Sequence, residues 1–383
     1  MVKSIGIDSG TKTMDIFGFD DKDGSIIIDV AIPRDEITKS SKLVLEKLRE
    51  AQNRFGKIDA IVGPSGYGMC LKKAQLATDE EIAEATFVTE ADVKRRLRII
   101  GLRELMLLLR SADDLNTWFT QGVIHLITVP KFRKVNRIDM GTSDKVLSVV
   151  LAEKDQAERL KIPYDKTSFF LVEVGFGYTS AIAVKNGQIV DAMAGTAGFP
   201  SFLGMGFLDS EVAYALANSM DDFSKQLLFA GGVASFAGFD SSRPLEEFVK
   251  AAKTDMKVKQ GYEMMLEAIV KDVASLLPTV IPKEIILSGR FTRIPEFMED
   301  MKIRLSGFFE EMNLKVEITM LESKAAVTKQ AAEGAAVFAN GLAGGKYKQL
   351  INTMNLMESE GTVFSNIYLG RDVAERLNAF KKL

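Results

Sequence analysis

Short runs of apolar and polar positions alternate over the first sixty residues, which predicts strands separated by tight turns. Ser4–Asp8, Thr13–Phe19 and Ser25–Ile32 read as three strands with polar, glycine-containing turns between them. Apolar residues then recur at helical spacing from about Thr38 to Phe55, and Ile58–Val62 is a further short apolar strand. The order is therefore three meandering strands, a helix and a fourth strand.

A second set of strands after residue 165 repeats the beginning of this pattern. Ser168–Glu173, Tyr178–Val184 and Gln188–Met193 read as strands joined by glycine-containing turns. Asp8 and Glu173 each close an apolar strand, and each is followed by a glycine two positions later. A repeated half is the simplest explanation, and the element order is typical of ribonuclease-H-like topology.

The rest of the chain has a mostly helical pattern. We expect one or two helices in Leu245–Leu277, and further helices at Pro295–Leu305, Ser323–Asn340 and Asp372–Phe380, with short strands at Glu284–Leu287 and Lys315–Met320. No low-complexity linker separates the halves. We therefore predict an α/β protein of two ribonuclease-H-like domains with an interdomain cleft: residues 1–150 with 346–383, and residues 151–345.

Composition excludes several classes of function. The 383 residues carry 49 Lys and Arg against 52 Asp and Glu, so bulk charge favours no nucleic-acid or membrane partner. No window reaches the roughly 18 uninterrupted apolar residues of a membrane helix. The N-terminus runs directly into a strand without a signal-peptide pattern, so we expect a cytoplasmic protein.

Single cysteine and histidine residues limit the chemistry further. Cys70 and His125 are the only residues of their types, which excludes a disulfide framework and His-rich zinc sites. A Ser-His-Asp triad would have to use His125, which lies in an apolar run. We favour instead a satisfied histidine in or beside a strand.

The first glycine turn has the residues of a phosphate-binding hairpin. A tight turn presents successive backbone N–H groups, and glycine lets the chain approach an anion closely. Asp8, at the strand end, can hold Mg²⁺ through water. A plain polar β-turn is the alternative. The candidate phosphate ligands are Ser9, Gly10, Thr11, Lys12 and Thr13.

A second turn and a third element complete the hypothesis. We expect the two hairpins to grip one triphosphate, with Glu173 as a second metal-binding acid. In the strand-turn-helix segment Glu284–Arg290, Gly289 can lie against a nucleoside and Arg290 can stack on its base; a turn needed only for topology is the alternative. The phosphate ligands of the second hairpin are Gly175, Phe176, Gly177 and Tyr178.

These motifs in this order resemble the acetate and sugar kinase, heat-shock-protein and actin superfamily. The quoted segments are 7–11, 173–177, 287–290 and 332–336. Within the superfamily the chain is most similar to the archaeal family of predicted butyrate kinases, and Asn136–Lys145 is similar to that branch's first connecting helix. The resemblance implies that the two ribonuclease-H-like domains are actin-like ATPase domains. It also implies ATP and Mg²⁺ as cofactors, phosphotransfer to a small-molecule carboxylate, and a homodimer. It implies that Ser288 and Gly334 lie near the nucleoside.

The acceptor determines which further residues react. A carboxylate is ionised at neutral pH and needs no general base, so cations and positioning suffice. The candidate cations are Lys12, Arg137, Lys145 and Arg290, although Arg137 and Lys145 fit solvated helix positions equally well. Asp139 is the candidate base for a hydroxyl acceptor.

The chain departs from the carboxylate kinases at four positions, one of which is an acidic residue expected near Thr128–Pro130 that is absent here. Asp8 stands where acetate and butyrate kinases have Asn, Pro64 where a substrate-side Arg is expected, and Met140 where the family has His. Asp8 favours a sugar or polyol kinase as one alternative. The missing Arg and His favour another, a non-kinase ATPase switch that acts on a partner protein.

Basic residues concentrate in Asp92–Arg110 among leucines. A helix with one solvated basic face explains this pattern more simply than a surface for a membrane or a partner.

Overall fold

The computed structural model describes residues 1–88, 92, 100–220 and 225–377, and its contacts divide the chain into two compact units. Unit 1 comprises Met1–Thr167, Asn186–Val190 and Glu322–Leu383; unit 2 comprises Ser168–Lys185 and Asp191–Leu321. These limits differ from the predicted domains, because α6 (Ser143–Leu160) and α12 (Gln330–Leu342) pack together within unit 1. The predicted α/β class is confirmed, with one sheet of six strands and one of five.

The first sheet has the order β3-β2-β1-β4-β6-β5. β1 pairs antiparallel with β2 and parallel with β4, as a strand meander followed by a helical crossover requires. The first four strands confirm the sequence prediction, whereas β5 and β6 are too short to give a period of two. The strands are β1 (Lys3–Ser9), β2 (Thr13–Asp20), β3 (Ile26–Pro33), β4 (Ala60–Val62), β5 (Lys72–Lys73) and β6 (Thr117–Phe119).

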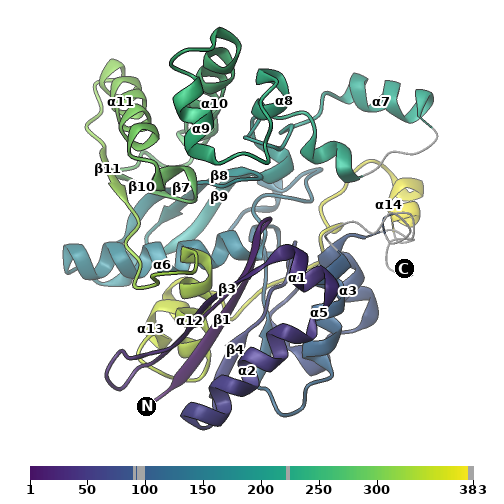
Figure 1. The fold of residues 1–383 in the computed structure, drawn as a ribbon, viewed down its shortest axis with the longest axis vertical. Helices are drawn as coiled ribbons and strands as arrows, with labels where there is room; N and C mark the ends of the chain where they lie inside the picture. Colours follow the sequence, from purple (N-terminus) through teal and green to yellow (C-terminus); the bar gives the residue numbers. More distant parts are fainter. Residues whose placement is uncertain (89–91, 93–99, 221–224, 378–383) are drawn as a thin grey trace. The chain divides into compact units, whose positions relative to one another are not determined.

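Helices of unit 1 pack against this sheet (Figure 1). The predicted helix of 38–55 is two helices, α1 and α2, which break at Ser40 and Ser41. A Cβ at Gly6 of β1 would overlap Ala332, Ala335 and Ala336, so the small residues of α12 do permit close packing. The other helices are α1 (Arg34–Lys39), α2 (Lys42–Phe55), α3 (Asp79–Thr86), α5 (Ile100–Arg110), α13 (Lys348–Thr353) and α14 (Arg371–Leu377).

Two predictions fall partly outside the described residues. Within the basic segment Asp92–Arg110, residues 93–99 lie outside the described residues and Ile100–Arg110 form α5. The predicted closing helix Asp372–Phe380 is described only as α14, without 378–380. Among the described helices, none combines the length and the apolar character that crossing a bilayer requires.

The second sheet has the order β11-β10-β7-β8-β9, with β10 parallel to both of its neighbours. Its helices surround an aromatic core in which Phe248 and Phe291 contact Phe202 at ring distances of 5.1 and 5.2 Å. The strands are β7 (Ser168–Val174), β8 (Thr179–Lys185), β9 (Gln188–Ala194), β10 (Glu284–Ser288) and β11 (Glu317–Met320). The helices are α7 (Ser210–Ser219), α8 (Val233–Ala237), α9 (Leu245–Ala251), α10 (Met256–Leu276) and α11 (Pro295–Glu311).

Short 3₁₀ helices connect several of these elements. They are η1 (Ala74–Leu76), η2 (Val123–His125), η3 (Lys131–Arg133), η4 (Tyr164–Lys166), η5 (Gly195–Ala197), η6 (Lys225–Phe229) and η7 (Phe291–Arg293).

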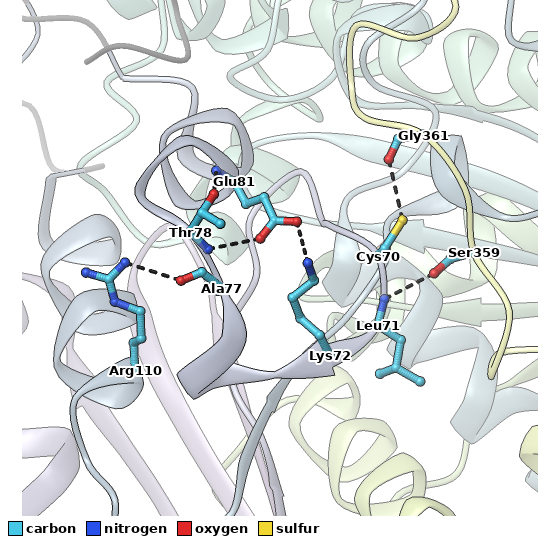
Figure 2. A network of polar contacts seen from close by, with 9 residues as sticks. All are labelled: Cys70, Leu71, Lys72, Ala77, Thr78, Glu81, Arg110, Ser359 and Gly361. Carbon is cyan, nitrogen blue, oxygen red and sulfur yellow. Dashed lines mark hydrogen bonds and ion pairs between the residues drawn. The ribbon is translucent and has the colours of Figure 1, made fainter.

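A segment near the C-terminus is tied to the N-terminal part of unit 1 (Figure 2). The backbone N–H of Leu71 donates to the Ser359 hydroxyl at 3.1 Å, and the Cys70 thiol approaches the Gly361 carbonyl at 3.5 Å. Nearby, the Glu81 carboxylate accepts from the backbone N–H of Thr78 and pairs with Lys72. Residues about 290 positions apart therefore stabilise the same region.

Candidate functional site

The predicted phosphate hairpin is a tight turn between β1 and β2. The Gly10 N–H donates to the Thr13 carbonyl at 3.0 Å, which closes the turn. The Lys12 carbonyl accepts from the backbone N–H of Arg34 at 2.9 Å, so α1 begins beside the hairpin. The structure thus brings the predicted ligands of the hairpin, residues 9–13, together on one local turn.

Two carboxylates lie at the base of this hairpin. Asp8 and Asp15 are direct cross-strand partners, and both are almost fully buried, at 2% and 1% exposed. Within the part of the chain that the structure describes, the Oδ1 atom of each has no hydrogen-bond partner. A buried carboxylate oxygen without a partner is costly, which makes this position suited to a cation or a bound water.

Lys329 supplies a positive charge that sequence reasoning missed. Its ammonium group pairs with Asp8 Oδ2 and lies 3.6 Å from Asp15 Oδ2. A Cβ at Gly10 would overlap this ammonium group, so the glycine leaves the space that the lysine fills. No spacing or motif in the sequence could indicate the contact, because 321 positions separate Lys329 from Asp8.

Backbone hydrogen bonds hold the segment that carries Lys329. Its own N–H donates to Asp15 Oδ2 at 3.1 Å. The Asp29 carboxylate of β3 accepts from the N–H groups of Ala326, Val327 and Thr328 at 2.7, 3.0 and 2.9 Å. This segment is an ordered loop, and the helix predicted from Ser323 begins only at Gln330.

Burial and charge shift the titration of the pair in defined directions. Burial raises the pKa of Asp8 from 3.8 to about 6, although the neighbouring Lys329 opposes this shift. Burial alone would lower the pKa of Lys329, but the charges of Asp8 and Asp15 outweigh it and raise that pKa. The lysine is therefore charged at neutral pH, and Asp8 takes up a proton in mildly acidic solution.

The start of α6 adds a second ion pair to this environment. Lys145 Nζ lies 2.9 Å from Asp144 Oδ2, and the Thr142 hydroxyl donates to the same carboxylate. Burial opposes ionisation of Asp144, yet these contacts lower its pKa. Asp144 also interacts electrostatically with Asp8 and Lys329. Lys145 is thus paired with Asp144, and its role as a cation of the site stays a prediction.

Arg34 is a second cation that the sequence did not indicate. Its guanidinium Nη1 donates to the Ser9 hydroxyl at 2.7 Å, and the residue is only 6% exposed. It is the first residue of α1, directly after the proline that ends β3. Its place in the sequence, in a helix start remote from any motif, carried no functional signal.

Arg137 and Asp139 lie before α6 rather than in a helix. The connecting helix expected over Asn136–Lys145 begins at Ser143, because Asn136 and Gly141 adopt positive φ values of 55° and 121°. Asp139 is buried, and its Oδ1 accepts from the Gly141 N–H at 2.9 Å, so it stabilises this turn. Its role as a base and the role of Arg137 as a cation stay predictions.

In unit 2 the second hairpin joins β7 to β8. The Gly175 N–H donates to the Tyr178 carbonyl at 3.1 Å, the same closing bond that Gly10 makes in the first hairpin. Side chains anchor the turn: Phe176 packs on Phe202 with ring centroids 5.5 Å apart, and the Tyr178 hydroxyl donates to the Leu228 carbonyl at 2.7 Å. Any phosphate contact of Phe176 and Tyr178 would therefore use their backbone.

Glu173 lies in a polar row at the end of this sheet. It is the register partner of Ser180 on β8 and of Ser288 on β10. Both serine hydroxyls are fully buried, and in the described part of the chain neither has a hydrogen-bond partner. These hydroxyls are free to donate to an anion or a bound water, which fits the predicted site at Glu173 and Ser288.

Two predicted nucleoside glycines have a packing role. Gly289 has a φ of 98°, and a Cβ there would lie 2.6 Å from the backbone carbon of Val174. A Cβ at Gly334 would lie 2.7 Å from the backbone carbon of Leu147, where α12 crosses α6. The close approaches seen here are to protein backbone, which favours the alternative interpretation of a turn needed for topology at Gly289. A contact of Gly334, Ser288 or Arg290 with a nucleoside stays a prediction.

The predicted Mg²⁺ site at Asp8 and Glu173 fits an ion that takes most of its ligands from water and phosphate. No cluster of three or more His, Cys, Asp or Glu side chains suited to a metal occurs among the described residues. Mg²⁺ commonly uses one or two carboxylates and takes its other ligands from water and phosphate. The partnerless Oδ1 of Asp8 fits such an ion arriving with a nucleotide, and Glu173 fits a water-mediated contact.

His125 is a buried residue of unit 1. His125 lies in η2, not in a strand, directly before Leu126, which bridges to Ser359. Burial lowers the pKa of His125 to about 4, so the ring is neutral, and its Nδ1 lacks a hydrogen-bond partner in the described residues.

In unit 2 a cavity of about 550 Å³ lies between α10 and α11, where Tyr262 donates to Asp300 and Arg304 pairs with Glu263. None of the predicted site residues lines this cavity, so it is not the candidate site.

A sequence model of one protein family matches almost the whole chain. This family is described as "Protein of unknown function (DUF1464)", and the match covers residues 6–369. No curated protein matches the chain.

Solved structures of carboxylate kinases share the fold. The crystal structure of Porphyromonas gingivalis acetate kinase superposes with a TM-score of 0.61 and 15% identity, over 88% of this chain and 99% of that chain. A propionate kinase from Francisella tularensis subsp. tularensis SCHU S4 gives a TM-score of 0.59 and 14% identity, over 87% and 99%. At such identities the likeness shows the fold alone, so the predicted superfamily stays a prediction. The finer resemblance to predicted butyrate kinases stays a prediction.

Proposed function

The chain belongs to the DUF1464 family, and we propose that it is an ATP-dependent phosphotransferase whose acceptor is a short-chain carboxylate such as butyrate. The observation that carries the proposal is the first hairpin: a closed glycine turn with Asp8 buried at its base and Lys329 paired to it. The acetate-kinase fold supports the same reaction class.

The residues of the chain bind and position the reactants. Backbone N–H groups and hydroxyls of residues 9–13 and 175–178 bind the phosphates of one nucleotide. Asp8 and Glu173 hold Mg²⁺, directly or through water, and the ion supplies charge stabilisation of the phosphates. Ser288, Arg290 and Gly334 contact the nucleoside. Lys12, Lys145 and Arg137 add positive charge where negative charge develops during transfer.

A carboxylate acceptor needs no general base. An ionised carboxylate can attack the terminal phosphorus directly, so no side chain has to remove a proton. This scheme therefore does not require His125, the only histidine, which is buried in η2. Positioning and cations then provide the catalysis.

A sugar or polyol kinase is the second candidate. It is favoured by Asp8, where acetate and butyrate kinases have Asn, and by the buried carboxylate of Asp139, which would accept the proton of a hydroxyl. A third candidate, an ATPase switch for a partner protein, is favoured by Pro64 and Met140 in place of Arg and His. We also propose a homodimer, which sedimentation of the purified protein tests.

Two measurements separate these candidates. A thermal-shift screen with ATP, ADP and Mg²⁺ tests nucleotide binding, since a ligand at 100 times its Kd stabilises by about 2.7 kcal/mol. Trapping of acyl phosphates with hydroxylamine across acetate, propionate, butyrate and longer acids then tests the acceptor. The Asp8→Ala variant, purified identically, controls for contaminating kinases.

Acyl hydroxamate formed by the wild-type protein and absent with Asp8→Ala supports the carboxylate kinase. ADP release that requires a sugar or polyol replaces it with the second candidate. ADP release only in the presence of another protein replaces it with the switch.

A further inference from the structure

The ammonium group of Lys329 occupies the inner side of the first hairpin. It pairs with Asp8, lies 3.6 Å from Asp15, and fills the space that a Cβ at Gly10 would take. The lysine side chain is 21% exposed, whereas the Asp8 side chain is 1% exposed. The cation therefore lies between a buried carboxylate and the outside of the turn that is proposed to bind phosphate.

The backbone under this side chain is held at four consecutive positions. The N–H groups of 326–328 donate to Asp29, and that of Lys329 donates to Asp15. Because the backbone is fixed, only the side-chain torsions of Lys329 remain free. The ammonium group can therefore move between nearby anions with little change in conformational entropy. A residue that binds a ligand in a defined position requires a backbone that is fixed in this way.

Charge in this cluster is not balanced by Lys329 alone. Asp8 and Asp15 carry two negative charges when ionised against one ammonium group, and the Oδ1 atoms of both lack a partner in the described residues. A magnesium ion near Asp8 would repel the ammonium group. Asp15, 3.6 Å from the ammonium group, and the terminal phosphate of a nucleotide in the hairpin are then the anions that attract it, and the phosphate carries the greater negative charge.

We propose that Lys329 is a phosphate-binding residue of this chain, whose ammonium group passes from Asp8 to the terminal phosphate of the nucleotide when Mg²⁺ binds at Asp8. The inference rests on the proposed function, because it needs a nucleotide in the first hairpin. It assigns a ligand contact to a residue that belongs to none of the motifs. It further makes Lys329 the group that covers Asp8 before the metal arrives.

Calorimetric titration with the magnesium complexes of AMPPNP and ADP tests the contact. In Lys329→Gln we expect the Kd of MgAMPPNP to rise about 10- to 100-fold, the range of one charge-assisted hydrogen bond, and the Kd of MgADP to rise less. Lys329→Arg keeps the charge and should recover part of the loss. Lys324→Gln, an exposed lysine of the same loop, is the matched control and should bind both as the wild type does.

Metal binding without nucleotide gives a second readout, which tests whether Lys329 covers Asp8. The difference between MgAMPPNP and MgADP is the readout that a merely structural lysine would not change. In Lys329→Gln, Asp8 is uncovered, so we expect Mn²⁺ to bind more tightly by electron paramagnetic resonance. Because loss of Lys329 leaves two buried carboxylates unpaired, Lys329→Gln/Asp15→Asn repeats both measurements with less buried charge.

Equal affinities for MgAMPPNP in the wild type and in a folded Lys329→Gln or double variant overturn the role of Lys329 and leave the proposed function standing. Equal weakening of MgAMPPNP and MgADP, with unchanged Mn²⁺ binding, also overturns it. A wild-type protein that binds neither nucleotide overturns the proposed function and this inference together.

Discussion

The ammonium group of Lys329 pairs with the carboxylate of Asp8, which is 321 positions away in the chain. The pair joins the start of α12 to the first hairpin, so the packing of one helix on the first sheet decides the charge at the candidate site. Predictions about this site therefore test both the fold and the proposed chemistry.

Removing the Asp8 carboxylate should separate metal-dependent from metal-independent binding. We expect Asp8→Ala to abolish the part of the ATP-induced thermal shift that depends on Mg²⁺, because the buried oxygen without a partner is the proposed metal contact. The measurement is the shift with ATP alone against ATP with Mg²⁺ in the same variant. Asp23→Ala, at an exposed turn of the same sheet, should keep the full difference. An unchanged difference in Asp8→Ala would mean that the metal is held elsewhere.

The raised pKa of Asp8, about 6, predicts how binding depends on pH. Below that value the carboxyl is protonated and no longer attracts Mg²⁺, so the affinity for MgATP should fall up to about tenfold per pH unit. The folded form binds this proton more tightly than the unfolded chain does, so protonation at Asp8 does not itself unfold the protein. Calorimetry from about pH 5 to 8, with metal-free ATP as the control, measures the effect. A flat profile for MgATP contradicts it.

Substitution of Gly289 should destabilise the protein strongly. Its φ is 98°, and a Cβ would lie within 2.6–2.8 Å of backbone atoms of Val174. We expect Gly289→Ala to lower the free energy of unfolding by roughly 3 kcal/mol or more, from left-handed strain and overpacking. Gly307→Ala in α11 is the matched control, because a Cβ there meets nothing within 4 Å. It should raise stability by about 0.5–1 kcal/mol. Urea denaturation that shows the same change for both variants would refute the packing explanation.

Glu153 of α6 should make stability depend on pH. The residue is fully buried, its Oε1 accepts from the Thr167 hydroxyl at 2.7 Å, and burial raises its pKa to about 8 from 4.5. Between these values the unfolded chain releases the proton that the folded chain keeps, so the free energy of unfolding falls as pH rises. We expect Glu153→Gln to remove this slope and to be more stable near pH 8 by roughly 2–4 kcal/mol.

Urea denaturation at about pH 5 and pH 8 measures the difference. Glu158→Gln, on the same helix and 46% exposed, should keep the slope of the wild-type protein. Parallel pH profiles for the wild type and Glu153→Gln would contradict the assignment.

Local pattern was enough to find the strands and both glycine hairpins. β1, β2, β7 and β8 begin and end within one residue of their predicted limits, because alternation and glycine turns act over a few neighbouring residues. Asp8 and Glu173 could be singled out in the same way, since each closes a strand. The sequence did not predict the short strands β5 and β6 or the break between α1 and α2, because two or three residues are too few to show a repeating apolar pattern.

Amino-acid order alone thus determined the hairpins, their acids and the α/β class, all of which follow from interactions between near neighbours. Only the folded chain decided which charges meet at the first hairpin. Lys329 reaches this hairpin through the packing of α12, and Arg34 reaches it from the start of α1. The sequence around neither residue indicates these contacts. Tertiary packing also decided that Gly289 and Gly334 lie against backbone, because a close approach involves two distant segments and is visible in neither one.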